Sequence, residues 1–334
     1  MQTAIAAIFV FLLVVLLHEL GHFTVAKLVG IKVNEFSIGM GPKLLQKTKG
    51  DTQYTLRLLP IGGYVKMEGE DENSDDPRSF SKVSPLSRIA VVAAGAFMNF
   101  VLAFIVLTIV AFNTGTPTNT IGEINADSPA EIGGLQAGDT IISINNISID
   151  NWDKLSDTIS NSNPDNNLKI DIIRENEKMN IVVKPVVEEG RTIIGIIPAY
   201  EKSISAAIKG GAENTVLFIE LMFDFLKSLF KGQVSTNDLS GPVGVITEIG
   251  RAADSGLTNL LFLLGFISVN LGFFNLLPIP ALDGSRIVFL LLEILRGKPI
   301  DSDKESFIHF IGFVLLISLM LIVTYKDLIR INIF

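Results

Sequence analysis

The sequence predicts an α-helical integral membrane protein with about four transmembrane helices, a small cytoplasmic-side membrane-associated β-sheet and one inserted extracytoplasmic α+β domain. Three observations support this fold class. Of the 334 residues, 48% are hydrophobic, which is too apolar for an ordinary soluble enzyme. Four apolar runs are long enough to cross a bilayer core of about 30 Å at about 1.5 Å per helical residue. Between the second and third runs, the pattern changes to short strands separated by turn residues.

Charge and cysteine content exclude several classes of protein. The formal net charge of −8 argues against nucleic acid as a partner. Because the chain has no cysteine, neither a disulfide framework nor a thiolate metal site can form. A cleaved signal peptide is the alternative for residues 1–26. It is disfavoured because no basic residue precedes the apolar run and cleavage would discard the histidine motif described next.

The first transmembrane helix is predicted at residues 1–26 and contains His18-Glu19-Leu20-Gly21-His22. Two imidazoles four positions apart lie on one helix face, so they can bind a single cation from one side. His-Glu-x-x-His is the spacing of zinc hydrolases, in which the glutamate acts as general base. An ionisable group near the bilayer centre costs about 2.5–3.5 kcal/mol on insertion scales. We therefore predict a metal site here rather than a chance pattern.

Residues 27–88 form a loop that holds most of the lysines and arginines near the spans. Such loops stay in the cytoplasm, so both chain ends and the inserted domain are expected outside. The histidine motif then lies towards the cytoplasmic side of its helix. The acidic run at residues 68–76 has no periodicity and is expected to be a solvated loop.

The same loop is expected to contain a small β-sheet. Ile31–Ile38 mostly alternates, Gly39–Pro42 breaks the pattern, Lys43–Thr48 and Thr52–Leu59 form a hairpin, and Tyr64–Met67 is a further short run. Two roles remain open for this sheet. It either serves packing alone, or it offers an edge strand near the active site that pairs with an extended peptide.

The second span is predicted at residues 89–112 and an α+β domain at residues 117–198. Strands of this domain are expected at 120–125, 140–145, 168–174, 179–187 and 192–197. Ser128 and Glu131 are spaced as a capping box around Pro129, and a second helix is expected at 151–160. The loop Gly134-Leu-Gln-Ala-Gly138-Asp139 resembles that of a PDZ domain of the bacterial protease type. The resemblance implies a groove for a peptide strand or chain end, and the alternative is a spacer whose groove stays empty.

Residues 204–231 combine a series of charged side chains with mostly apolar neighbours. The charges recur at spacings of three, four or seven, so they form one stripe on a helix. Each would cost about 2.5–3.5 kcal/mol in mid-bilayer, so we expect an amphipathic helix along the outer membrane surface. Gly210-Gly211 is expected to mark a hinge or break near its start.

Residues 257–296 contain the third span and a second group of functional candidates. Pro278 and Pro280 interrupt the backbone, which membrane depth tolerates only where protein or a water-filled cavity surrounds it. Asp283 has two interpretations: the N-cap of the next helix, or the third protein ligand that a catalytic zinc needs. The two-histidine motif at matching depth favours the ligand.

The fourth span, predicted at residues 307–325, contains His309. We expect a hydrogen-bonded interior residue there, because three ligands are already assigned.

Three other protein classes fit less well. A soluble zincin with Glu35 as third ligand conflicts with the apolar first helix, and an ion or metal transporter should show inverted repeats. A non-catalytic PDZ scaffold leaves the charged first helix unexplained.

The two motifs in this order, with one intervening PDZ-like domain, resemble the site-2 protease family of intramembrane zinc metalloproteases, of the bacterial regulator-of-sigma-E protease type. The resemblance implies His18, His22 and Asp283 as ligands of one Zn²⁺ and Glu19 as catalytic base. It implies that Asn275, with Pro278 and Pro280, contacts the unwound substrate. It also implies a structural role for Gly95 and Asn99. Some relatives carry two tandem PDZ domains, whereas this chain has room for one.

The resemblance implies a zinc-dependent intramembrane endopeptidase of regulated intramembrane proteolysis. Its expected substrates are transmembrane segments of pre-trimmed single-span proteins, such as anti-sigma factors, or signal-peptide remnants. The expected partners are these segments, the lipid bilayer and a peptide at the PDZ-like groove, with no nucleic acid. The expected location is the bacterial plasma membrane.

Overall fold

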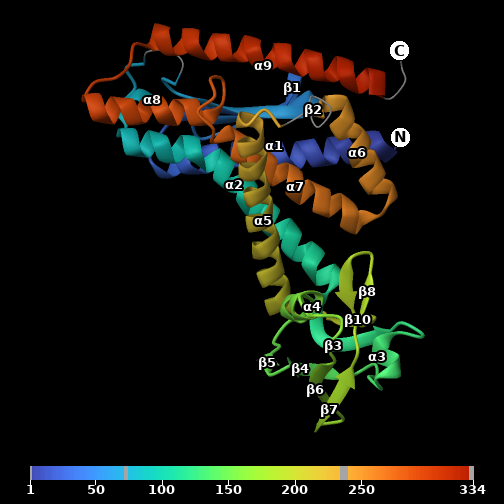
Figure 1. Cartoon of the computed structure of the whole chain (residues 1–334). Helices are drawn as coiled ribbons and strands as arrows, with labels where there is room; N and C mark the ends of the chain where they lie inside the picture. The colour runs from blue at the N-terminus through green and yellow to red at the C-terminus, as the bar shows by residue number, and fades with distance from the viewer. Residues whose placement is uncertain (1, 71–73, 234–239, 331–334) are drawn as a thin grey trace. The chain divides into compact units, whose positions relative to one another are not determined.

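The computed structural model describes residues 2–70, 74–233 and 240–330 (Figure 1). The chain divides into two compact units. The first, called the membrane unit here, comprises residues 1–110 and 211–334. The second, the inserted unit, comprises residues 111–210. The two units are described separately.

Four helices are long and apolar enough to cross a membrane, as predicted. They are α1 (Gln2–Leu28), α2 (Pro85–Thr114), α7 (Leu257–Asn275) and α9 (Ser302–Arg330) (Figure 1). Lipid tails are as apolar as leucine, so such helices associate through close packing rather than by escape from water. Glycines permit that packing here. A Cβ at Gly21 of α1 would overlap the Ala94 carbonyl oxygen of α2, and one at Gly272 of α7 would lie 2.9 Å from the Ala96 carbonyl oxygen.

The sheet of the membrane unit is made by β1 (Val33–Lys49) and β2 (Thr52–Met67), which pair antiparallel. Glu35 has Cα partners in both halves of β2, Gln53 and Lys66, so this part of β1 is the middle of the sheet. The predicted break at Gly39–Pro42 is instead a bend within one strand. Gly39 and Gly41 have φ values of +82° and +85°, which glycine adopts without the strain that a side chain would bring.

The acidic run after β2 was expected to be solvated, but three of its described carboxylates, Glu68, Glu70 and Asp76, have side-chain partners. Glu68 accepts hydrogen bonds from Ser74, Asn34 and Lys32, and these partners lower its pKa to about 2. Asp76 also accepts from Lys32. These hydrogen bonds hold the segment against the start of β1. The sequence did not indicate them, because the partners are far apart in the chain.

The remaining helices of the membrane unit are the short 3-10 helix η1 (Phe80–Lys82), α5 (Ile204–Phe230), α6 (Pro242–Asp254) and α8 (Asp283–Arg296). Helix α5 is unbroken at Gly210 and Gly211, so the predicted break is wrong. A side chain at Gly211 would overlap Thr108 of α2, which means that this glycine serves close packing. The placement of α5 along the outer membrane surface stays a prediction.

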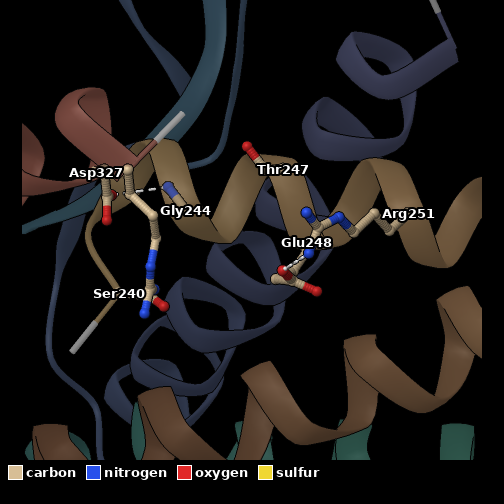
Figure 2. A pocket seen from close by; sticks show the side chains of 7 residues that line it. Ser240, Gly244, Thr247, Glu248, Arg251 and Asp327 are labelled. Atoms are coloured by element: carbon tan, nitrogen blue, oxygen red, sulfur yellow. Dashed lines mark hydrogen bonds and ion pairs between the residues drawn. The ribbon is translucent and has the colours of Figure 1, made fainter. Parts of the chain in front are cut away.

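Helix α6 was not expected from the sequence. It starts at Pro242, a residue suited to the first helical position, and its N-terminal Gly244 N–H donates to the buried Asp327 carboxylate of α9 at 2.8 Å (Figure 2). Ser240, Thr247 and Arg251 line a cleft of about 330 Å³ beside this contact (Figure 2). Asp327 therefore joins the C-terminal end of α9 to α6.

The inserted unit is a six-stranded sheet with two short helices. The sheet order is β10-β3-β4-β6-β7, with β5 paired to β4. The strands are β3 (Thr116–Ile124), β4 (Thr140–Ile144), β5 (Ile147–Ser148), β6 (Leu168–Arg174), β7 (Glu177–Val183) and β10 (Ile196–Glu201), with a separate hairpin of β8 (Val186–Glu188) and β9 (Arg191–Ile193). The helices are α3 (Pro129–Ile132) and α4 (Trp152–Ser160).

Aliphatic side chains fill the core of the inserted unit. Ile141, Ile144, Ile170 and Ile172 are fully buried on facing strands. The predicted cap at Ser128 is present, since its side chain accepts from the Glu131 N–H at 3.3 Å. This unit therefore follows the ordinary rules of a water-soluble domain, with alternating strands and locally capped helices.

Candidate active site

His18 and His22 lie one turn apart on α1 and bring their Nε2 atoms together. These two atoms are 3.1 Å apart, and the rings meet edge to face with centroids 4.7 Å apart. The residues are 8% and 9% exposed, although α1 is a helix that can cross a membrane. Two buried imidazoles with converging nitrogens form half of a metal site.

Asp283 completes the group from the other end of the chain. The backbone breaks between α7 and α8, and Asp283 is the first residue of α8. Its Oδ2 lies 3.2 Å from His18 Nε2 and 3.5 Å from His22 Nε2. The N-cap position belongs to Leu282, and no side-chain cap hydrogen bond is made there, so the helix-cap interpretation of Asp283 is wrong. The carboxylate is directed to the histidines instead.

The three converging atoms have the spacing of a tetrahedral zinc site. Zinc binds imidazole nitrogen and carboxylate oxygen at about 2.0–2.2 Å, which separates neighbouring tetrahedral ligands by roughly 3.3–3.6 Å. The observed separations of 3.1, 3.2 and 3.5 Å are close to that range. Asp283 Oδ2 is also buried without a hydrogen-bond donor among the described residues. A buried carboxylate oxygen with no donor is costly unless a cation takes that place, so the donor set fits zinc.

The outer nitrogens of both histidines contact α2. His22 Nδ1 donates to the Val91 carbonyl oxygen at 2.9 Å, which leaves the Nε2 lone pair free to bind a metal. His18 Nδ1 lies 3.2 Å from the fully buried Asn99 amide. Asn99 Oδ1 lacks a partner among the described residues, and turning it towards His18 lets it accept from Nδ1–H. Asn99 then orients the second ligand as Val91 orients the first.

Gly95 provides the space in which the histidines sit. A Cβ at this position of α2 would overlap His22 Nε2 and would lie 2.8 Å from His18 Cε1. Gly21 brings the two helices together on the other side of the same contact. Close approach of α1 and α2 therefore depends on two missing side chains, one on each helix.

Glu19 is half-buried beside the three donors. Its carboxylate is near enough to interact electrostatically with His22, His18 and Asp283. A Cβ at Gly63 of β2 would lie 3.4 Å from Glu19 Cγ, so the backbone of β2 passes against the glutamate. Tyr64 and Val65, which follow Gly63, have Cα partners in β1 on one side, and in the described part of the chain no strand pairs with their other side. An open strand edge therefore begins next to Glu19.

The segment expected to contact substrate lies between α7 and α8. Asn275 is the last residue of α7 and is half-buried, and its side chain makes no hydrogen bond to residues that the structure describes. Pro278 is exposed, whereas Pro280 packs against Gly312 of α9. The structure therefore brings neither Asn275 nor Pro278 into a defined contact at the donors.

Sequence reasoning missed the close contact of Gly21 with α2, and the contacts of His309 and Gly312 of α9 with residues 280–281. A glycine inside an apolar helix was the available signal for Gly21 and Gly312, because it often marks close helix packing. The expectation for His309 is confirmed. Its Nδ1 accepts a hydrogen bond from the Ala281 N–H at 3.1 Å, and it is outside the donor group.

Known proteins are similar to this chain over nearly its whole length. The model of the family described as "Peptidase family M50" matches residues 6–319. A chain from Clostridium acetobutylicum is 42% identical over 329 residues, which cover 97% of both chains. Zinc metalloprotease RasP of Bacillus licheniformis is 34% identical, with 99% of each chain covered. Regulator of sigma-W protease RasP of Bacillus subtilis is 33% identical, with 98% of this chain and 99% of the relative covered.

Proposed function

This chain belongs to peptidase family M50 and is a zinc metalloprotease of the site-2 protease type, and from that premise we propose that it cleaves peptide bonds within the transmembrane segments of pre-trimmed single-span membrane proteins. One observation carries the proposal. Two of the three zinc-compatible donors sit on α1, a helix that can span a membrane, so the chemistry takes place where transmembrane segments are found.

The residues take the following roles in the proposed reaction. His18, His22 and Asp283 would hold one zinc ion and would leave a position for water. Zinc, when bound, lowers the pKa of that water and polarises the scissile carbonyl. Glu19 accepts a proton from the attacking water as the C–O bond forms, and then passes that proton to the leaving nitrogen as the C–N bond breaks. Gly95 and Asn99 hold the histidines in place.

A helical substrate must be extended before its backbone can be attacked, because helix hydrogen bonds shield the amides. The open edge at Tyr64–Val65 begins beside Glu19, and backbone pairing along that edge would hold an unwound segment next to the base. Asn275, Pro278 and Pro280 contact the same segment at the irregular end of α7. Of the two roles open for the sheet, we therefore favour substrate presentation.

The substrate class and topology belong to the same proposal. The Bacillus subtilis relative is named for regulation of sigma-W, which favours an anti-sigma factor over a signal-peptide remnant. The distribution of basic residues places the site towards the cytoplasmic side of a bacterial plasma membrane, with both termini and the inserted unit outside. The inserted unit is a PDZ-like domain whose groove receives a peptide strand or chain end.

The test is a comparison of membrane proteomes between wild type and Glu19→Gln. The amide cannot accept the water's proton, so single-span fragments that already lack most of their outer portion should accumulate, while zinc content stays at one per chain. Glu220→Gln, an exposed carboxylate on α5, is the matched control and should leave the proteome unchanged. Cleavage by Glu19→Gln at more than a few per cent of wild type would remove Glu19 from this role. Accumulation of soluble peptides instead would contradict the membrane substrate.

A further inference from the structure

The segment that carries Asp283 is irregular and needs support from outside. Residues 276–282 join α7 to α8 and contain two prolines. Ala281, two positions before Asp283, has a φ of +75°, a left-handed conformation that costs an alanine roughly 1–2 kcal/mol. A conformation of this kind persists only where the surroundings enforce it.

Helix α9 supplies that support at two positions one turn apart. The His309 Nδ1 accepts the Ala281 N–H at 3.1 Å, which is the hydrogen bond made by the strained residue itself. Gly312 lies against Pro280 so closely that a Cβ there would overlap the proline. The two contacts fix consecutive residues of the segment against one face of α9.

The His309 ring is held from two further directions. It packs against Phe289 of α8 with centroids 5.7 Å apart, and its Nε2 lies 3.8 Å from Glu305 Oε1 on the preceding turn of α9. An Nδ1 that accepts from a backbone N–H has no proton of its own, so the proton of the neutral ring is on Nε2, towards Glu305. The ring is therefore set as an acceptor for Ala281.

We propose that His309 is a positioning residue for the metal site: its Nδ1 holds Ala281 in the left-handed conformation that directs Asp283 Oδ2 to the two histidine nitrogens. This inference rests on the proposed function, since it presumes that Asp283 is the third zinc ligand. His309 acts through the backbone and does not itself bind zinc, because its Nε2 carries the ring proton and the residue lies outside the donor group.

The experiment compares three replacements of His309 in the full-length protein in detergent or lipid nanodiscs. Asparagine carries an oxygen where histidine has Nδ1 and can still accept from Ala281. Glutamine places its amide at the far end of the ring, and leucine has no acceptor. Zinc affinity is measured by competition with a chelator, and the Co²⁺-loaded protein reports ligand geometry through its visible absorption.

We expect His309→Leu and His309→Gln to weaken zinc binding 10- to 100-fold and to change the Co²⁺ spectrum, as loss of an outer-shell partner does in other metal sites. His309→Asn should stay within about threefold of wild type and keep the spectrum. Ser318→Ala, on an exposed face of α9, is the matched control and should change neither readout.

Asp283→Ala separates the failure of this inference from the failure of the proposed function. Normal zinc affinity in Asp283→Ala would refute the ligand assignment itself. Weak zinc binding in Asp283→Ala together with wild-type affinity and spectrum in His309→Leu would overturn the role of His309 alone. Equal weakening by all three replacements would also overturn it, because it would mean that ring volume matters and the hydrogen bond does not.

Discussion

Two pairs of glycines, one pair in each unit of this protein, serve opposite purposes. In the membrane unit, a Cβ at Gly21 or Gly95 would overlap atoms of the neighbouring helix, so the missing side chain is what matters. In the inserted unit, Gly134 and Gly138 have φ values of +85° and +95° with nothing within 4 Å of a Cβ, so only the backbone conformation matters. The difference follows from where each pair lies, since Gly21 and Gly95 are on packed helices and Gly134 and Gly138 are at turns. A domain in water is held by apolar burial and needs glycine at its turns, whereas helices in lipid are held by contact itself.

The two units also differ in how a buried carboxylate is paired with positive charge. Asp139 of the inserted unit is 1% exposed, and the Arg174 guanidinium binds it with two hydrogen bonds of 2.7 Å. Asp283 of the membrane unit faces two histidines and no arginine or lysine among its described neighbours. The first carboxylate carries its own counter-charge and is structural. The second has no such counter-charge among the described residues, which is why we propose it as a metal ligand.

The largest expected effect comes from one substitution made in both units. Gly95→Ala should displace His22, abolish zinc binding and lower cleavage at least about 100-fold, the usual result of misplacing a catalytic group by about 1 Å. Gly134→Ala should cost about 1 kcal/mol of local stability and leave zinc unchanged. Zinc per chain and cleavage of one substrate are the measurements. Wild-type zinc content in Gly95→Ala would refute the claim that the histidines need the space left by the missing side chain.

An intermediate effect is expected from Asp139→Ala. Removal of this carboxylate leaves the Gln136 N–H and the Arg174 guanidinium without their partner, which should lower the free energy of local opening by about 2–3 kcal/mol. Hydrogen exchange of β4 and β6 amides in the full-length protein measures it. Glu177→Gln, an exposed carboxylate on β7, is the control. Loss of zinc in Asp139→Ala would show that the two units do not behave independently.

The smallest effect concerns Glu68 and the segment of the membrane unit at residues 74–80. The hydrogen bond from Ser74, with those from Asn34 and Lys32, lowers the Glu68 pKa from 4.5 to about 2. Its stabilisation is therefore complete above about pH 4.5 and is lost as the pH falls towards 2. Hydrogen exchange in residues 74–80 should be constant, after correction for intrinsic rates, from pH 7 to 5 and should then rise. In Glu68→Gln this additional rise should be absent, and a persisting rise would assign it to another group.

Local signals in the sequence were sufficient for much of this structure. The apolar runs indicated the four long helices, and alternation indicated a strand at the residues where β6 occurs. The spacing of His18 and His22 placed two donors on one face, and the prolines before Asp283 indicated the backbone break that brings the third. Each of these features is encoded within about twenty residues, where helix and strand periodicity act.

The rest depended on partners far apart in the chain. No pattern around His309 points to Ala281, and none around Lys32 points to Asp76. The bend at Gly39 was mistaken for a break, because a glycine with positive φ interrupts alternation without ending the hydrogen bonding of the strand. Helix α6 was overlooked because the carboxylate that accepts from its first turn, that of Asp327, lies on another helix.

The order of the donors along the chain has a consequence for biosynthesis. His18 and His22 leave the ribosome with the first helix, whereas Asp283 follows about 260 residues later, and His309 later still. At roughly 5–20 residues per second, the two histidines wait on the order of 13–50 s for the third donor. On the proposed ligand set, a nascent chain therefore has no complete metal site until α8 is made, and a fragment that stops before α8 lacks the third donor. The proposed zinc site can be completed only when synthesis is nearly finished.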